Sequence, residues 1–298
     1  MEYINISNKE YKFVIGNRKD DNYRMSFNEL TERTFGFNLE QWYQDGYWKN
    51  QYIPYSLMAD NKVVSNVSVN IMNMNVYGKT KQLIQLGTVM TDVAYRNQGL
   101  LRVLLEKVIA DWKTKCDYIY LFANESVLDL YPKFGFTKFN QFQCTKLISK
   151  NREGRSVKKL IMSNKYDREY VFDKAKTSFP IAQISMLDNA ELIMFYCTLF
   201  QKDNVYYIRE LDTVIVANFE YDTLEIYEVF CNKEDVSLDK ILFYMLREET
   251  TKVKLYFTPK ETESYKFTPL EEDTLFILGS DTMLQNNRNF MFPILSHT

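Results

Sequence analysis

The chain has 298 residues, of which 46% are hydrophobic and 15% aromatic, enough to bury one large core or two ordinary ones. Its 37 lysines and arginines against 39 aspartates and glutamates give a net charge of -2. We therefore expect no overall basic surface for nucleic acid or an anionic membrane, so that any anion site must be local. The only histidine is His297, which argues against Ser-His-Asp, Cys-His and HExxH chemistry.

The N-terminus and the cysteines predict a compartment. The first residues, MEYINISNKE, lack the apolar core of a signal peptide, and no run of 18 apolar residues follows, so we expect a cytoplasmic protein without a membrane span. The cysteines are widely spaced without a CxxC pair, which predicts buried reduced thiols and neither disulfides nor a metal site. His297 lies beside the C-terminus, where we expect a frayed surface residue.

The first 50 residues are predicted to be helical. Tyr23, Phe27 and Phe35 recur at helical spacing before Gly36, and a second short helix is predicted from Asn38. Strands are predicted next. Residues 52–78 alternate between apolar and polar side chains around a turn at Asp60 and Asn61, which indicates a hairpin, and a third strand is predicted over 81–93.

A helix with one apolar stripe is predicted over 99–112, and the short apolar run 117–124 is typical of a central strand. A further helix over 126–133 and strands over 134–139 and 142–148 complete the first half.

The polar segment 150–159 predicts a linker. The second half repeats the order of the first more loosely, with strands near 205–210, 213–219 and 223–231, a helix through Leu238, Ile241, Leu242 and Met245, and a strand at 253–258. We therefore expect an α+β fold of two tandem domains, residues 1–150 and 151–298, each with a mixed, mostly antiparallel sheet flanked by helices.

The junction between the strand 81–93 and the helix 99–112 suggests an anion site. It consists of Arg96, Asn97, Gln98, Gly99, Leu100 and Leu101. The first turn of a helix has N–H groups without intrahelical partners and partial positive charge, which suits a pyrophosphate. Gly99 lets the backbone approach the phosphates, and Arg96 adds a multidentate cation. The plain alternative is a solvated turn.

The segment YRNQGLL resembles the Q/R-x-x-G-x-G/A acetyl-CoA loop of the GCN-related N-acetyltransferases, the GNAT superfamily, with Arg96 and Gly99 at its marked positions. Downstream, ANESVLDLYPKFGF is similar to the same superfamily's strand-end asparagine and helix tyrosine, supplied by Asn124 and Tyr131. Leu101 departs from the usual small residue. The GLL variant resembles tandem acetyltransferases of the enhanced-intracellular-survival type, which also pair two GNAT-like halves.

The resemblance implies acetyl-CoA as cosubstrate and places its pantetheine arm between the two central strands. The backbone of Val89, Met90 and Thr91 would pair with the arm, and a bulge would direct an N–H toward the thioester carbonyl. The resemblance gives Tyr131 the role of general acid for the leaving thiolate, although a tyrosine there is also well suited to core packing.

The general base is left open between Asp92, Glu125 and a water chain. For the acceptor amine, LEQWYQDGYW at 39–48 offers aromatic walls around one carboxylate, but an amphipathic helix that buries its rings against the sheet explains the same pattern.

In the second half, CNKEDVSLDKIL occupies the place of the loop. It has no glycine or arginine and carries Glu234 and Asp235, which would repel phosphates, so we expect a degenerate domain without a coenzyme site. The leading hypothesis is an N-acetyltransferase acting on an amine of a small molecule or peptide. The alternatives are a non-catalytic acyl-CoA-binding protein and, less well supported, an aminoacyl-tRNA-using transferase.

Overall fold

The computed structural model describes residues 2–148, 157–271, 274–279, 284, 286 and 289–297. The linker predicted at 150–159 lies mostly outside these residues. Within them, no helix is both long and apolar enough to span a membrane.

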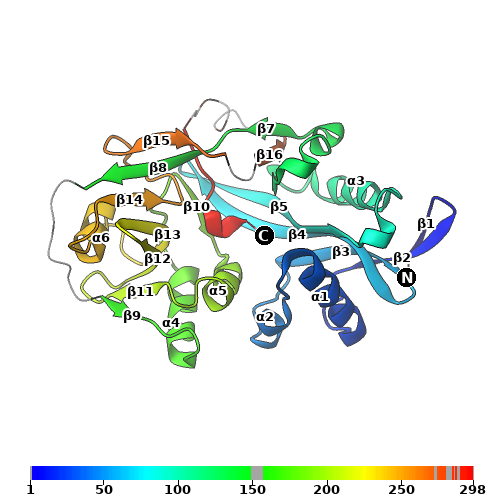
Figure 1. Ribbon diagram of the computed structural model, residues 1–298, viewed down its shortest axis with the longest axis horizontal. Helices are drawn as coiled ribbons and strands as arrows, with labels where there is room; N and C mark the ends of the chain where they lie inside the picture. The colour runs from blue at the N-terminus through cyan, green and yellow to red at the C-terminus, as the bar shows by residue number, and fades with distance from the viewer. Residues whose placement is uncertain are drawn as a thin grey trace.

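Two sheets lie side by side, each with helices on its faces (Figure 1). The order of the first sheet is β1 (Glu2–Ile6), β2 (Lys9–Ile15), β3 (Tyr52–Ala59), β4 (Lys62–Val76), β5 (Lys79–Thr91), β6 (Tyr118–Ala123), β16 (Thr274–Leu278) and β7 (Thr137–Phe139), with β10 (Ile184–Leu187) pairing with β4. The order of the second is β15 (Lys266–Pro269), β8 (Phe142–Leu147), β14 (Lys252–Leu255), β13 (Thr223–Cys231), β12 (Thr213–Glu220), β11 (Val205–Ile208) and β9 (Lys158–Lys159). The α+β class with mostly antiparallel sheets is confirmed.

The sheets do not divide the chain at residue 150. Strand β8 precedes that residue but pairs with β14 and β15 in the second sheet, while β16 comes from the C-terminal part and pairs with β6 and β7 in the first. The boundary between domains 1–150 and 151–298 remains a prediction. The first sheet contains two strands from the far side of it, β10 and β16, and the second sheet contains one, β8.

The helices lie on both faces of the first sheet. Helices α1 (Asp21–Phe35) and α2 (Glu40–Gln44) cover one face and α3 (Leu100–Trp112) the other (Figure 1). Strand β6 is buried on both sides, because Tyr118 and Tyr120 pack on the α1 side while Ile119 and Leu121 pack on the α3 side.

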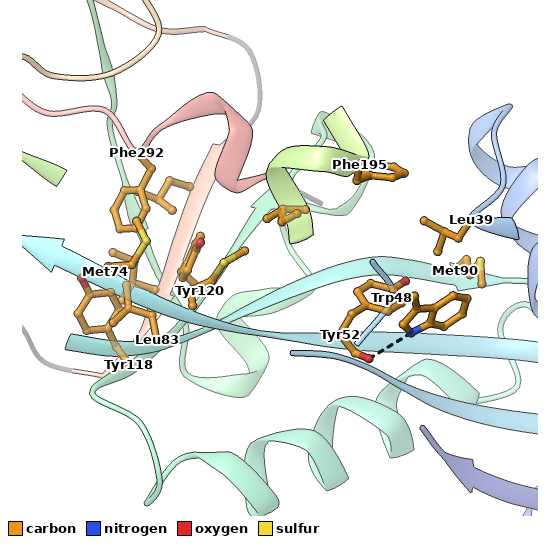
Figure 2. Packing of buried hydrophobic residues seen from close by; sticks show 14 of the residues in the cluster. Leu39, Trp48, Tyr52, Met74, Leu83, Met90, Tyr118, Tyr120, Phe195 and Phe292 are labelled. Atoms are coloured by element: carbon orange, nitrogen blue, oxygen red, sulfur yellow. Dashed lines mark hydrogen bonds between the residues drawn. The ribbon is translucent and has the colours of Figure 1, made fainter. Parts of the chain in front are cut away.

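The second half adds α4 (Lys165–Lys176), α5 (Ala190–Leu199) and α6 (Leu238–Met245). Helix α5 reaches the first sheet, where Phe195 lies in the same apolar cluster as Leu39 and Tyr52 (Figure 2). This contact brings side chains of the second half over the α1 face of the first sheet.

Two local predictions are wrong. The N-terminus is not helical throughout, since a β1–β2 hairpin precedes α1. The helix expected over 126–133 is replaced by two 3-10 turns, η2 (Glu125–Val127) and η3 (Tyr131–Phe134). Pro132 lacks an N–H and cannot continue an α-helical ladder, which accounts for the short turns.

Candidate active site

The loop before α3 presents a row of free backbone donors. Asn97 and Gly99 have φ of 61° and 86°, and Gly99 is the N-cap of α3 without a side-chain cap. Among the described residues, the N–H groups from 97 to 102 have no hydrogen-bond acceptor. When φ alternates in sign along the residues before a helix, their N–H groups point into one concave surface, which is suited to an anion.

The side chains of the loop leave that surface open. Leu100 is buried and Leu101 is partly buried against the apolar cluster beneath α3, so the leucine that departs from the family pattern packs into the core. Arg96 is exposed, and its Nε donates to the Thr91 carbonyl at 3.2 Å. The guanidinium therefore stays near the end of β5.

Gln98 is held by a hairpin that the sequence did not predict. Its Oε1 accepts from the Tyr11 hydroxyl at 3.3 Å and from Lys9 Nζ at 3.5 Å, and its carbonyl accepts from Ser7 Oγ at 3.3 Å. The β1–β2 hairpin thus supports the loop from behind. Ser7 and Asn8, both at positive φ, form its turn, and the Ser-Asn pair was the available sequence signal.

The two central strands separate next to this loop. β5 and β6 pair in parallel from Leu83–Tyr118 to Leu86–Leu121 and no further. The backbone of Val89, Met90 and Thr91 therefore lies beyond the last β5–β6 pair, on the strand that leads into the loop.

A bulge interrupts β5 where the strands separate. Ser68 pairs with Gly87 and Asn66 with Met90, so Thr88 and Val89 stand opposite a single residue of β4. Thr88 has φ of 45°, a conformation that costs a threonine on the order of 1 to 3 kcal/mol. The glycine within the strand was a usable sequence signal for a bulge.

A buried network of side chains holds the bulge. Asn66 Nδ2 donates to the Thr88 carbonyl at 2.9 Å, and the Tyr52 hydroxyl lies 2.5 Å from Thr88 Oγ1. The network continues through Ser68 and Ser56 to the Tyr23 hydroxyl. Burial raises the pKa of Tyr52, so its hydroxyl keeps its proton.

Tyr131 lies in η3, on the α3 side of the sheet. Its ring packs edge-on against Phe136 and tilted against Phe276, and burial raises its pKa to about 12. Among the described residues its hydroxyl has no hydrogen-bond partner. Asn124 is exposed, and its Oδ1 accepts from the backbone and hydroxyl of Ser126 at 3.1 and 2.6 Å, which caps η2.

The two carboxylates considered as bases differ in their surroundings. Asp92 accepts from the Ala94 N–H at 3.0 Å and pairs with Arg33 at 2.9 Å, with 18% of its side chain exposed. Glu125 is exposed at the start of η2 and forms no hydrogen bond or ion pair within the described part of the chain. Asp92 thus already has a capping and a charge-pairing role.

The aromatic segment 39–48 is mainly core. Trp42 and Trp48 are 6% and 3% exposed, and their indole N–H groups donate to the carbonyls of Glu191 and Tyr52. Asp45 is the C-cap of α2, and its Oδ1 accepts from the Gln41 side chain at 3.0 Å. The interpretation as rings buried against the sheet is the one that the packing supports.

The gap in the second sheet is filled by the chain itself. Strands β13 and β14 pair only from Thr223 to Ile226, and the segment before β10 then pairs with both sides. The Phe179 N–H donates to the Cys231 carbonyl at 2.8 Å, and the Gln183 N–H donates to the Thr258 carbonyl at 2.9 Å.

The expectation of a frayed His297 is wrong. Its ring stacks on Phe122, its carbonyl accepts from the Tyr196 hydroxyl, and burial lowers its pKa to about 3. The terminal segment is held between α5 and β6 because its apolar residues are buried there. All four cysteines are free. Cys144, Cys197 and Cys231 are buried, and Cys116 is partly buried.

The family model of the acetyltransferase (GNAT) domain matches residues 19–139. A protein from Enterococcus faecalis, described as a probable N-acyltransferase, has a similar structure with a TM-score of 0.60 and 14% identity, over 89% of this chain and 72% of that one. Eis1 from Mycobacterium abscessus matches with a TM-score of 0.56 and 12% identity, over 89% of this chain and 73% of that one. A GCN5-related N-acetyltransferase from Anabaena variabilis matches with a TM-score of 0.57 and 11% identity, over 93% of this chain and 75% of that one.

At these identities the structural matches show the fold alone. A comparison with curated proteins found no match. The matched segment contains α1, the bulge in β5 and the donor loop before α3, and the solved structures share the arrangement of most of the chain. Residues 19–139 therefore match the family model of the acetyltransferase (GNAT) domain, and the chain shares the fold of the solved structures.

Proposed function

We propose that the chain is an acetyl-CoA-dependent N-acetyltransferase that transfers an acetyl group to a primary amine of a small molecule or peptide. The observation that carries this proposal is the row of N–H groups from 97 to 102 at the start of α3, which have no acceptor among the residues that the structure describes. They would bind the pyrophosphate, with Arg96 as the adjacent cation, while Val89, Met90 and Thr91 offer a strand edge for the pantetheine arm.

In this proposal the amine attacks the thioester directly within a ternary complex. An N–H at the bulge stabilises the charge that develops on the carbonyl oxygen, an effect worth roughly 3 kcal/mol. The network from Asn66 and Tyr52 keeps that part of the backbone in place. Tyr131, protonated because its pKa is raised, would donate to the leaving thiolate.

For the base, the proposal favours a water chain, to which Glu125 could contribute because it is exposed and unpaired among the described residues. Asp92 is the weaker candidate, because its carboxylate already pairs with Arg33 and accepts from the Ala94 N–H.

The second half is proposed to be a GNAT-like domain without a coenzyme site. Support comes from the acidic loop at Glu234 and Asp235 and from the segment 178–183, which occupies the gap between β13 and the chain after β14. A cytoplasmic location and the absence of nucleic-acid or membrane partners remain predictions from the sequence.

The second candidate is a protein that binds acyl-CoA without turnover. The packing of Tyr131 between Phe136 and Phe276 favours it, since a core tyrosine needs no catalytic role. Calorimetry with acetyl-CoA tests binding, and thiol release across a panel of amines tests transfer. Micromolar binding with no release for any amine would leave the binding protein as the better description.

Replacement of Tyr131 by Phe then tests the acid. Because the hydroxyl would act only in the transition state, turnover should fall about 100-fold while the affinity for acetyl-CoA stays within about twofold. Thiol release and calorimetry on the same preparation measure both. Wild-type turnover in this variant would leave Tyr131 with a packing role only.

A further inference from the structure

A small apolar cavity lies directly beside the bulge in β5. It is lined by Leu39 and Trp42 next to α1, by Tyr52 and Thr88 of the sheet, and by Leu192 and Phe195 of α5, with Phe37 at its edge. Thr88 is thus shared by the cavity and by the strained part of the strand. Figure 2 shows Phe195 on α5 above the sheet, on the side of Leu39 and Tyr52.

The walls contributed by α5 are fixed in place. Trp42 Nε1 donates to the Glu191 carbonyl at 2.8 Å, and Lys49 pairs with the Glu191 carboxylate at 2.8 Å. The ring centroid of Phe195 lies 5.7 Å from that of Trp42, in an edge-on contact, and 5.7 Å from that of Phe37. The cavity is therefore bounded by a helix of the second half that is anchored to the first half.

The cavity can accept only a small, uncharged group. None of its lining residues carries a charge, and its two hydroxyls, of Tyr52 and Thr88, are already hydrogen-bonded to each other. The cavity volume is about 20 Å³, which leaves room for a single methyl-sized group. An ammonium would lose its hydration there without gaining a partner.

We infer that this cavity holds the methyl of the acetyl group, and that Leu192 and Phe195 limit the length of the acyl chain that the protein accepts. The inference rests on the proposed function, which puts the thioester carbonyl at the bulge and the acyl carbon next to Thr88. A chain two methylenes longer would have to displace Phe195 or Leu192 from a packed cluster. The second half then determines acyl specificity although it binds no coenzyme.

The test compares coenzyme A, acetyl-CoA and butyryl-CoA with the full-length protein. Replacement of Phe195 by Ala removes the end wall. Replacement of Phe200 by Ala removes a ring of the same type that follows the same helix, contacts Phe37 and Phe195, and does not line the cavity. Leu192→Ala is a second enlargement, for use if loss of the Phe195 ring prevents folding.

In calorimetry, the wild type and the Phe200 variant should bind acetyl-CoA at least about tenfold more tightly than butyryl-CoA. The Phe195 or Leu192 variant should reduce this ratio to about one. The ratio of kcat/KM values for the two thioesters, measured by thiol release, should change in parallel wherever an amine supports turnover.

The inference is overturned if wild type binds both thioesters equally well, or if folded Phe195 and Leu192 variants keep the wild-type ratio. A change in amine preference without a change in the thioester ratio would assign the cavity to the acceptor and also overturn it. Failure of the proposed function has a different signature, because coenzyme A itself would then not bind to the wild type or to any variant.

Discussion

The guanidinium of Arg96 is exposed near the end of β5, and within the described part of the chain its one hydrogen bond is from Nε to the Thr91 carbonyl, which leaves its terminal nitrogens available to an anion at the start of α3. Replacement of Arg96 by Ala should weaken the binding of coenzyme A about 10- to 100-fold, because a hydrogen bond to a charged group contributes roughly 1.5 to 3 kcal/mol. The fold should be unaffected, since little is packed against this side chain. Calorimetry gives the affinity.

Arg102 provides the matched control for this experiment. It is exposed on the first turn of the same helix and pairs with Glu106 four residues later, at 2.9 Å. Replacement of Arg102 by Ala keeps the backbone N–H of residue 102 and removes only an exposed side-chain charge paired with Glu106, so the affinity should change less than about threefold. Equal losses in the two variants would indicate general charge attraction rather than a phosphate contact by Arg96.

Glu228 is a buried carboxyl without a cation partner among the described residues, and its Oε1 accepts from the Val229 N–H at 3.1 Å. Burial raises its pKa from 4.5 to about 7. The folded state therefore holds the proton more tightly than the unfolded state, so its contribution to stability is complete below pH 4.5 and is lost as the pH rises to 7. The loss corresponds to about 3 kcal/mol.

Replacement of Glu228 by Gln should remove this dependence. We expect the variant to be more stable than the wild type at pH 8 and about equally stable near pH 4.5, as measured by urea unfolding at both pH values. The exposed Glu220→Gln serves as the control and should leave the difference between the two pH values unchanged. If the free energy of unfolding changed with pH by the same amount in the Glu228 variant and in the wild type, the claim that this buried carboxyl is neutral would be contradicted.

At the scale of the element, the bulge in β5 depends on groups outside its own strand. Thr88 is held at φ of 45° by Asn66 of β4 and Tyr52 of β3. Replacement of Tyr52 by Phe should reduce the free energy of unfolding by about 1 to 3 kcal/mol, since Thr88 Oγ1 loses its partner. Turnover should fall about tenfold with unchanged coenzyme affinity, because a looser bulge stabilises the transition state less.

Tyr23 separates the two effects. Its hydroxyl lies at the other end of the same network, 2.7 Å from Ser56 Oγ, and it is also almost fully buried. Tyr23→Phe should reduce stability by a similar amount and turnover much less. If both variants lose turnover in proportion to stability, the network is only structural and does not position the bulge.

At the scale of the whole molecule, the exchange of β8 and β16 makes each half depend on the other. Without β16, the strand β6 would have an unpaired edge, and the buried side chains of Leu275, Phe276 and Ile277 would be missing from the first sheet. A fragment of residues 1–150 should therefore be aggregated or only partly folded.

Co-expression of fragments 1–150 and 151–298 should restore a complex that unfolds cooperatively, because the strands can then pair across the cut. Size-exclusion chromatography and thermal unfolding followed by circular dichroism measure assembly and cooperativity. A fragment 1–150 that unfolds cooperatively alone, at the temperature of the full chain, would contradict the interdependence.

Local patterns predicted the parts of the site that are made from consecutive residues. Helix α1, the β3–β4 hairpin, β5, α3 and β6 all follow from side-chain periodicity and turn residues, because these elements bury one face or a short apolar run. The donor loop followed from Gly99 and Arg96 for the same reason. The free N–H groups are a property of any helix start without a cap.

Only the tertiary structure decided which distant segments meet. The insertion of β16 beside β6, the bond from Asn66 to Thr88, the pairing of Asp92 with Arg33 and the burial of His297 all join residues far apart in the sequence, for which periodicity carries no signal. The cavity beside Thr88 belongs to the same class, since Leu192 and Phe195 are ordinary apolar residues of an amphipathic helix until α5 packs on the first sheet. The sequence thus determined the local elements and the donor loop before α3, while burial between distant segments determined which segments are neighbours, the strained bulge and the size of the cavity.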